Sequence, residues 1–223
     1  VVCAATLELR MLPGIERPGI GIVTPTLKGP AFIIDVGANI DPKPNQLLQY
    51  GIMADAYCRN ILNKDNPSVG LLNIGEEEAK GTDFMREVHE LLSKSKLNFI
   101  GNIEGKDLFS GKCDVIISDG FVGNVALKVS ESAAEAMQAF LKRHLLSNIM
   151  GKIGLFFLMP SLKRFKKDID YAEYGGAPLL GVNGVVIIGH GRSNARAIKN
   201  AIRVANEEIE RKINDKILGA VKE

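Results

Sequence analysis

Four short segments of the chain carry residues that could bind an anion. They span residues 35–39, 73–81, 118–124 and 189–194, and each is rich in glycine and polar side chains directly after an apolar run. Backbone N–H groups, side-chain amides and cations in such turns suit a phosphate or another oxyanion. Each segment alone is also explained by the tolerance of glycine and asparagine for left-handed turns. An anion site is therefore predicted only if several of these segments meet.

Two side chains within these segments are candidates for catalysis. Lys80 is the cation of a segment that contains three glutamates, and it is either a solvated lysine that screens them or a point charge that neutralises a phosphate or an oxyanion. Asn124 is either an ordinary first-turn helix residue or an amide donor to an oxyanion, joined there by the N–H groups of residues 120–123. The remaining candidates for binding phosphate or substrate are Asp35, Gly37, Asn39, Asn73, Gly75, Asp119, Gly120, Gly123 and His190.

The elements that must position these residues alternate between short apolar runs and longer helical patterns. The predicted strands span residues 19–24, 31–36, 69–74, 97–101, 114–118 and 185–189. The predicted helices span residues 44–62, 82–93, 123–147 and 193–217. Strand followed by helix, repeated, predicts an α/β fold of three layers, with a largely parallel sheet between two layers of helices. Because ligands bind beyond the carboxyl ends of strands in such sheets, we expect the four segments to meet at one edge.

The ends and faces of the helices carry ordinary signals. Thr82 and Ser193 are predicted N-caps, and Pro44 stands where a missing N–H is harmless. The last helix has apolar residues at helical spacing, which predicts a stripe that faces the core. The residues of this stripe are Ile198, Ile202, Ala205, Ile209 and Ile213.

Composition excludes several classes of protein. The chain has 223 residues, 46% of them apolar and 24% charged, with a formal net charge of +2, so residues 1–223 are predicted to form one globular domain without nucleic-acid binding. Three dispersed cysteines and three dispersed histidines predict a reducing, cytoplasmic environment and no metal site. Segment 189–194 begins like a dinucleotide fingerprint but ends in asparagine, and no nucleotide P-loop or serine-hydrolase elbow occurs.

Residues 136–167 lack any acidic residue and combine seven Lys or Arg side chains with many large apolar ones. Gly151, Gly154 and Pro160 are expected to divide this segment into short helical pieces, and residues 136–170 to form a protruding helical hairpin. The hairpin is either buried against the body or a second subunit, or it is an amphipathic anchor for an anionic membrane surface, which we favour. The predicted membrane contacts are Leu155, Phe156, Phe157, Leu158, Lys163 and Arg164. Its basic residues also suit an acidic carrier protein, and its apolar patch suits an acyl chain.

Several motifs stand in a fixed order through nearly the whole chain. They are residues 35–39 (Asp-Val-Gly-Ala-Asn), 43–44, 49–53, 69–77, 80–81, 98–104, 118–125 and 174–181. Together they resemble the phosphate acyltransferase family of phospholipid synthesis (PlsX), without its N-terminal portion. The chain also lacks an initiator methionine, so we expect the natural protein to begin earlier.

The resemblance implies transfer of a long acyl group from acyl-(acyl carrier protein) to inorganic phosphate, which gives acyl phosphate and free carrier. It implies a fold like that of isocitrate and isopropylmalate dehydrogenases, no cofactor, a homodimer, and peripheral association with the cytoplasmic membrane. It places Lys80 and Asn124 at positions that the family uses in catalysis.

Three other functions stay open on the sequence alone. A related enzyme would take its acyl group from coenzyme A, as phosphotransacetylases do. A non-catalytic, membrane-binding scaffold is the second alternative. An oxidoreductase of the dehydrogenase superfamily is the third, and the missing nicotinamide fingerprint counts against it.

Overall fold

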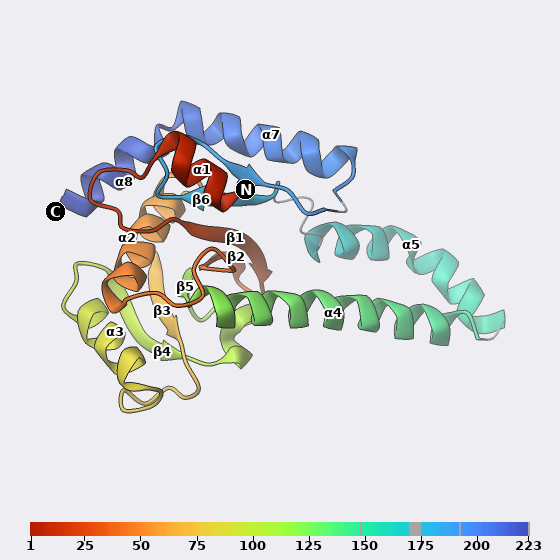
Figure 1. Ribbon diagram of the computed structural model, residues 1–223. Coiled ribbons are helices and arrows are strands. Elements are labelled where there is room, and N and C mark those ends of the chain that lie inside the picture. The colour runs from red at the N-terminus through yellow and green to blue at the C-terminus, as the bar shows by residue number, and fades with distance from the viewer. Residues whose placement is uncertain (148, 170–174, 192, 223) are drawn as a thin grey trace.

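The fold is built on a seven-stranded sheet with strand order β4-β3-β5-β2-β1-β6-β7 (Figure 1). The computed structural model describes residues 1–147, 149–169, 175–191 and 193–222, with the side chains of 163–169 left aside. The strands are β1 (Gly19–Thr26), β2 (Gly29–Ile34), β3 (Ser68–Leu72), β4 (Asn98–Ile103), β5 (Val115–Ile117), β6 (Ala177–Leu180) and β7 (Ile187–Ile188). The helices are α1 (Val2–Leu9), α2 (Pro44–Asn60), α3 (Asp83–Ser93), the 3₁₀ helix η1 (Gly105–Phe109), α4 (Gly120–Leu145), α5 (Ile149–Ile169), α7 (Ala195–Glu210) and α8 (Ile213–Lys222).

The sheet is mixed, so the expectation of a largely parallel sheet is corrected. Strands β4, β3, β5 and β2 pair in parallel, whereas β1 pairs antiparallel with both β2 and β6, and β7 pairs antiparallel with β6. Only Leu27 and Lys28 separate β1 from β2, and two residues make a hairpin but never a parallel crossover. Strand β6 was missed because Pro178 stands inside it, and proline argues against a strand.

Helices cover both faces of the sheet, as the strand–helix alternation predicts. On one face, α2, α3 and α8 bury large side chains against the strands, and Tyr57 of α2 stacks on Phe32 of β2 with ring centroids 4.4 Å apart. On the other face, η1 and the first turns of α4 pack against Ile33, Ile116 and Ile103. Helix α1 packs beside them over β6. These two cores fix the sheet and therefore the loops at its edges.

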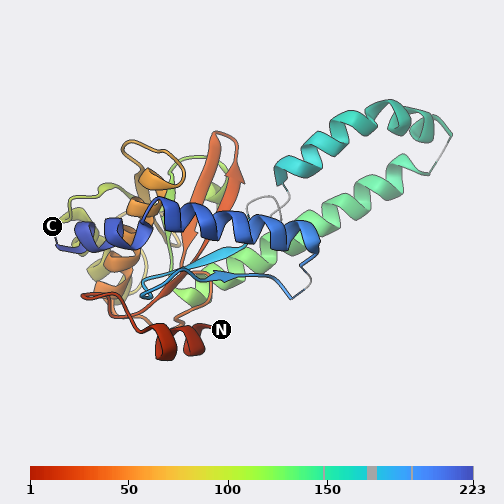
Figure 2. The same ribbon diagram turned by 90° about the horizontal axis from the view of Figure 1, so that it is seen from above.

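Helices α4 and α5 form a hairpin that extends away from the sheet (Figures 1 and 2). The expected division of its second arm into short pieces is wrong: α5 is one helix from Ile149 to Ile169, and Pro160 lies inside it. Phe156 and Phe157 are 74% and 75% exposed, Leu158 is exposed, and Leu155 is half-buried. The side chains of Lys163 and Arg164 lie outside the described residues. Among the described helices, none has the length and apolar character needed to cross a bilayer.

The predicted last helix is two helices, and its predicted core stripe is wrong in part. Lys212, at φ 52°, separates α7 from α8, so the apolar residues of the predicted stripe belong to two helices with different axes. Ile213 is buried in α8, but Ile198, Ile202 and Ile209 of α7 are 47%, 66% and 62% exposed. The buried face of α7 consists of Ala197, Val204 and Glu208 instead. The N-cap of α7 is Asn194, whose side chain accepts the N–H of Ala197, and not Ser193.

Glu208 is a carboxyl group inside the contact between α7 and the rest of the fold. It is 3% exposed, and its Oε1 atom has no hydrogen-bond partner within the described part of the chain. Burial raises the pKa of this carboxyl from 4.5 to about 8. The folded chain therefore keeps a proton on Glu208 at neutral pH that the unfolded chain has already released.

We expect Glu208→Gln to flatten the pH dependence of stability between pH 4.5 and 8. In that window the folded chain binds more protons than the unfolded chain, so the free energy of unfolding falls as pH rises, by at most about 1.4 kcal/mol per unit. Above about pH 8 this contribution is constant. Urea denaturation at pH 5, 6.5 and 8 measures it, with Glu210→Gln, at an exposed position of the same helix, as the matched control. Parallel pH curves for the parent chain and Glu208→Gln would contradict the assignment.

Candidate active site

Three of the four predicted segments lie at one edge of the sheet. Because β2, β5 and β3 are parallel neighbours, the segments that follow them, 35–39, 118–124 and 73–81, leave the sheet on the same side. We call these three segments the rim. The fourth segment does not join the rim, because β7 runs opposite to β2 and carries Gly189 and His190 toward the other edge. The expected place of His190 in the site is therefore corrected.

The first rim segment is wrapped around its own carboxylate. Asp35 is fully buried, and its two oxygens accept the backbone N–H groups of Ile20, Gly37, Ala38 and Asn39 at 2.7–3.0 Å. Burial raises the pKa of Asp35, and these N–H donors oppose that rise. The N–H groups of residues 37–39 are consequently occupied within the chain.

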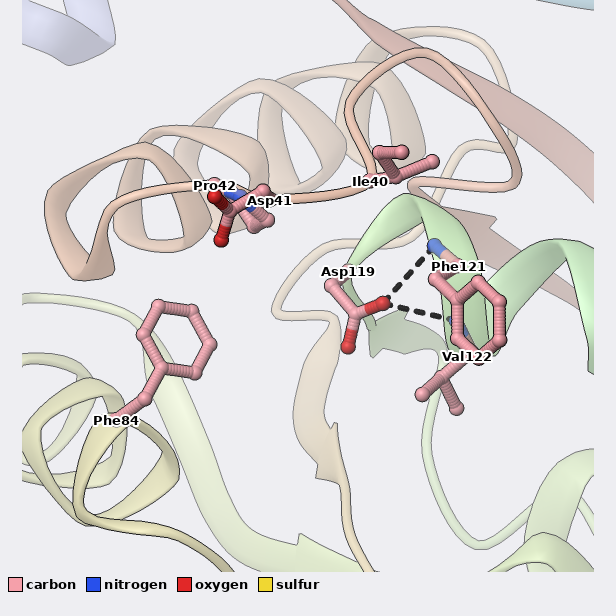
Figure 3. Close-up of a pocket in the computed structure, with 7 residues that line it drawn as sticks. All are labelled: Ile40, Asp41, Pro42, Phe84, Asp119, Phe121 and Val122. Carbon is pink, nitrogen blue, oxygen red and sulfur yellow. Dashed lines mark hydrogen bonds between the residues drawn. The ribbon is translucent and has the colours of Figure 1, made fainter.

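The second rim segment is capped by Asp119 at the start of α4. Its Oδ1 atom accepts the N–H groups of Phe121 and Val122 at 2.9 and 2.8 Å, as Figure 3 shows. The N–H of Gly120 donates to the carbonyl of Asn39, and that of Gly123 donates to the carbonyl of Asp119. The expectation that the N–H groups of 120–123 serve an oxyanion is thus wrong, because an N-cap and a neighbouring loop already accept them.

Close packing of α4 against the first segment places Asn124. A Cβ atom at Gly123 would lie 1.9 Å from the carbonyl oxygen of Asp35, so the helix can approach this loop only with glycine there. A Cβ atom at Gly37 would lie 2.7 Å from Nδ2 of Asn124, which puts the exposed Asn124 amide directly over Gly37. The Asn124 amide has no hydrogen bond to any described residue.

The third rim segment carries Lys80 on a loop closed by asparagine. The Asn73 amide accepts the N–H of Ile74 and donates to the carbonyl of Lys80 at 3.1 Å. The N–H of Lys80 donates to the carbonyl of Glu77 at 3.0 Å. A Cβ atom at Gly75 would lie 2.9 Å from Cγ of Lys80, so the lysine stem lies across this glycine.

Lys80 is not the ion-pair partner of Glu76, although the Glu77 carboxylate and the Lys80 stem both lie over Gly75. The Glu76 carboxylate lies 3.3 Å from Nζ of Lys106 and 3.1 Å from Nζ of Lys112, and these two ammonium groups lower the pKa of Glu76. Within the described residues, Lys80 makes no ion pair or side-chain hydrogen bond, and its side chain is exposed. Its charge is available to a ligand.

The predicted rim side chains therefore divide into two groups. Asp35, Asp119 and Asn73 spend their hydrogen bonds on backbone groups of the rim, and the Asn39 amide donates to Gln46 Oε1 at 2.9 Å. Lys80 and Asn124 are left without a partner in the part of the chain that the structure describes.

A pocket of about 270 Å³ opens between the start of α3 and the start of α4 (Figure 3). Phe84 faces it from α3, directly after the Lys80 loop, and Phe121 and Val122 face it from α4. Its remaining lining residues are Ile40, Asp41, Pro42 and Asp119. The sequence did not single out Ile40 and Phe84, because apolar residues such as these are ordinary core residues by pattern; in the structure Ile40 is exposed and Phe84 is half-buried against the core. Among the described residues, no cluster of His, Cys, Asp and Glu could hold a metal ion.

Comparison with known proteins gives a family. The family model described as fatty acid synthesis protein matches residues 1–216. The chain belongs to the fatty acid synthesis protein family. This confirms the family that the ordered motifs indicated.

Relatives in this family carry the name phosphate acyltransferase. The one from Thermodesulfovibrio yellowstonii is 51% identical over 211 residues, which cover 95% of this chain and 61% of that protein. The one from Aquifex aeolicus is 51% identical over 204 residues, or 92% of this chain and 60% of that protein. The chain thus spans about 60% of the length of the curated relatives it matches.

Two solved structures share the fold of this family member. A phosphotransacetylase from Streptococcus pyogenes superposes with a TM-score of 0.61 at 18% identity, over 94% of this chain and 59% of that chain. The EutD phosphotransacetylase from Staphylococcus aureus gives 0.56 at 14% identity, over 99% of this chain and 58% of that chain. These likenesses establish an α/β fold with a mixed, partly parallel sheet of the phosphotransacetylase type.

We expect Asp35→Asn to lower the free energy of unfolding by about 1–3 kcal/mol or more, because an amide leaves at least one buried backbone N–H without an acceptor. Urea denaturation at pH 7 measures the change. Asp41→Asn, at an exposed position six residues along the chain, is the matched control and should shift stability by less than about 0.5 kcal/mol. Equal unfolding midpoints for the two variants would show that Asp35 does not hold the rim.

Proposed function

We propose that the chain carries the site of an acyltransferase that moves a long-chain acyl group from acyl-(acyl carrier protein) to inorganic phosphate. The names of its relatives support this activity. The observation that carries the proposal is the pair of unpartnered side chains on the rim, one cation and one amide donor. A cation neutralises phosphate, and an amide stabilises the oxyanion that forms at a carbonyl.

The reaction needs positioning more than it needs a nucleophilic side chain. A phosphate oxygen attacks the thioester carbonyl carbon, and the carbonyl electrons move to oxygen. When the tetrahedral species collapses, a carbon–oxygen bond has formed, the carbon–sulfur bond breaks, and the carrier thiolate leaves with the electron pair. Phosphate is already an anionic nucleophile near neutral pH. Holding it beside the carbonyl contributes roughly 7–11 kcal/mol in favourable cases.

Each free rim side chain has a distinct role in this mechanism. Lys80 offsets the charge of phosphate and its repulsion from the developing oxyanion. Asn124 donates its Nδ2 protons to that oxyanion. Asp35 and Asp119 act as positioning residues, because their oxygens are engaged by the rim backbone. Gly37, Gly75, Gly120 and Gly123 let the segments approach closely, and Asn39 and Asn73 hold them in place.

The pocket between α3 and α4 suits the apolar part of the acyl thioester. Phe84, Phe121 and Val122 offer apolar surface beside the two segments that carry Lys80 and Asn124. Cys113 is an unsuitable acyl acceptor, because burial raises the pKa of its thiol to about 12. Direct attack by phosphate needs no nucleophilic side chain, because phosphate is itself the nucleophile.

An acyl donor built on coenzyme A is the second candidate. The fold shared with two phosphotransacetylases favours it. The projecting hairpin of α4 and α5 favours the carrier-bound, long-chain donor, because exposed aromatic and basic residues suit a lipid surface or an acidic carrier.

The same hairpin supports peripheral contact with an anionic cytoplasmic membrane surface. Met150, Phe156 and Phe157 of α5 are about three-quarters exposed, and Lys142 and Lys152 of the same hairpin are also exposed. Apolar side chains of this size enter the acyl boundary while lysines meet anionic headgroups. A second copy of the chain is the alternative occupant of this surface, consistent with the expected homodimer.

We expect Asn124→Ala to lower kcat by about 100-fold or more, since loss of one oxyanion donor raises the barrier by about 2.7–4 kcal/mol. We expect Lys80→Ala to raise the KM for phosphate as well as lower kcat.

The assay for both variants follows release of free carrier from palmitoyl-carrier with and without phosphate. Palmitoyl-coenzyme A, used as the donor in a parallel assay, distinguishes the carrier-bound from the coenzyme A-bound acyl donor. Lys128→Ala, an exposed lysine farther along α4, is the control. Carrier release that is independent of phosphate, or full activity in both variants, would refute the proposed mechanism.

We expect Phe156→Glu with Phe157→Glu to abolish sedimentation with vesicles that contain anionic lipid, because two carboxylates replace the most exposed aromatic pair of the hairpin. Leu27→Glu with Phe109→Glu adds the same charge at exposed positions of the body and should leave sedimentation unchanged. If the hairpin variant binds vesicles normally but changes oligomeric state, the surface is a subunit contact instead.

A further inference from the structure

The Lys80 loop, residues 73–81, is held by ion pairs near its start and by a hydrogen bond near its end. At its start, Glu76 forms ion pairs with Lys106 and Lys112, which are long and exposed side chains. At its end, Asn73 holds the carbonyl of Lys80. The turn formed by residues 77–80 sets the direction in which the Lys80 side chain leaves the backbone, and of these two contacts only that of Asn73 reaches it, at its last residue.

Two side chains outside the loop bind this turn: Arg86 of α3 donates to the carbonyl of Ala79 at 3.4 Å, and the shorter bond comes from Asn102 of β4. Its Nδ2 atom donates to the carbonyl oxygen of Glu77 at 2.9 Å. The same carbonyl accepts the N–H of Lys80 at 3.0 Å. One oxygen therefore joins the strand to the backbone of Lys80, and Asn102 is the described side chain that connects them.

Asn102 is placed there at an energetic disadvantage. It is 3% exposed, and its Oδ1 atom has no hydrogen-bond partner within the described residues. A buried acceptor without a partner destabilises the fold, and an apolar residue of the same shape would avoid this cost. The stability of the fold therefore does not by itself explain why an asparagine stands at position 102. The hydrogen bond that its amide donates to the Lys80 loop does explain it.

We propose that Asn102 is a positioning residue that sets the Lys80 ammonium group at the rim by holding the carbonyl of Glu77. This inference rests on the proposed function for its catalytic consequence, because the ammonium group matters only if phosphate binds there. Its structural part, the ordering of the turn before Lys80, stands on the hydrogen bonds alone.

The strand offers a matched control. Asn98, at the other end of β4, also donates its Nδ2 to a loop carbonyl, that of Asn66, at 3.3 Å. Asn98→Leu and Asn102→Leu thus each remove one amide-to-carbonyl bond from the same strand with a side chain of similar shape. Only the Asn102 bond leads to Lys80.

The first experiment measures amide hydrogen exchange of the whole chain without ligand. Asn102→Leu should accelerate exchange of the Lys80 N–H by about 5–10-fold, the factor that corresponds to loss of one hydrogen bond, without lowering the melting temperature. Asn98→Leu should leave exchange at Lys80 unchanged. Should Asn102→Leu fail to fold, Asn102→Ala, which leaves room instead of an apolar branch, is measured in its place. Unchanged exchange at Lys80 in the folded variant overturns the proposal, whatever the activity.

The second experiment is a double-mutant cycle on phosphate-dependent carrier release. Asn102→Leu should lower kcat about tenfold in the parent chain but less than twofold in the Lys80→Ala background, because a residue that acts through Lys80 has no effect once the lysine is gone. An equal further loss in both backgrounds overturns the positioning role. If Lys80→Ala itself retains full activity, the proposed function fails, and the exchange result still decides whether Asn102 orders the loop.

Discussion

The rim depends on one constraint: many of its backbone N–H groups are already bonded within the chain, five of them to the carboxylates of Asp35 and Asp119. Asp35 accepts three of them, those of residues 37–39, and the N–H of Ile20 in a fully buried site, and Asp119 caps α4 beside it. A loop whose donors are already engaged has one conformation, and α4 packs against it closely enough to require glycine at position 123. Two exposed side chains of the rim, Lys80 and Asn124, remain without a hydrogen-bond partner among the described residues, and the proposed anion site rests on them.

This arrangement differs from a phosphate site built on a glycine-rich backbone, where free N–H groups bind the ligand. Here the glycines allow close approach between segments, and in the proposed site the ligand is bound by a point charge and an amide. In such a site the direction of the Lys80 side chain depends on the conformation of its loop. Asn73 and Asn102 hold that loop through hydrogen bonds to its carbonyl groups.

Sequence patterns predicted much of this architecture because they report local preferences. Apolar runs gave six of the seven strands to within a few residues, and the acid-free segment gave the projecting hairpin of α4 and α5. The missed strand contains Pro178, and the isoleucines of α7 follow helical spacing but face solvent. In both cases the local signal was real, and the neighbours available in three dimensions overrode it.

The sequence by itself determined the family and the segments of the rim, and it singled out Lys80 and Asn124, the two side chains on which the proposed phosphate site depends. Only the tertiary structure decided that His190 leaves from the opposite edge, that the N–H groups of residues 120–123 are already bonded, and that Asn102 supports Lys80 from a neighbouring strand. The physical reason is the same for all three. Residue type and spacing state what a group is able to bind, whereas strand direction and the distant partner of each hydrogen bond exist only once the chain has folded.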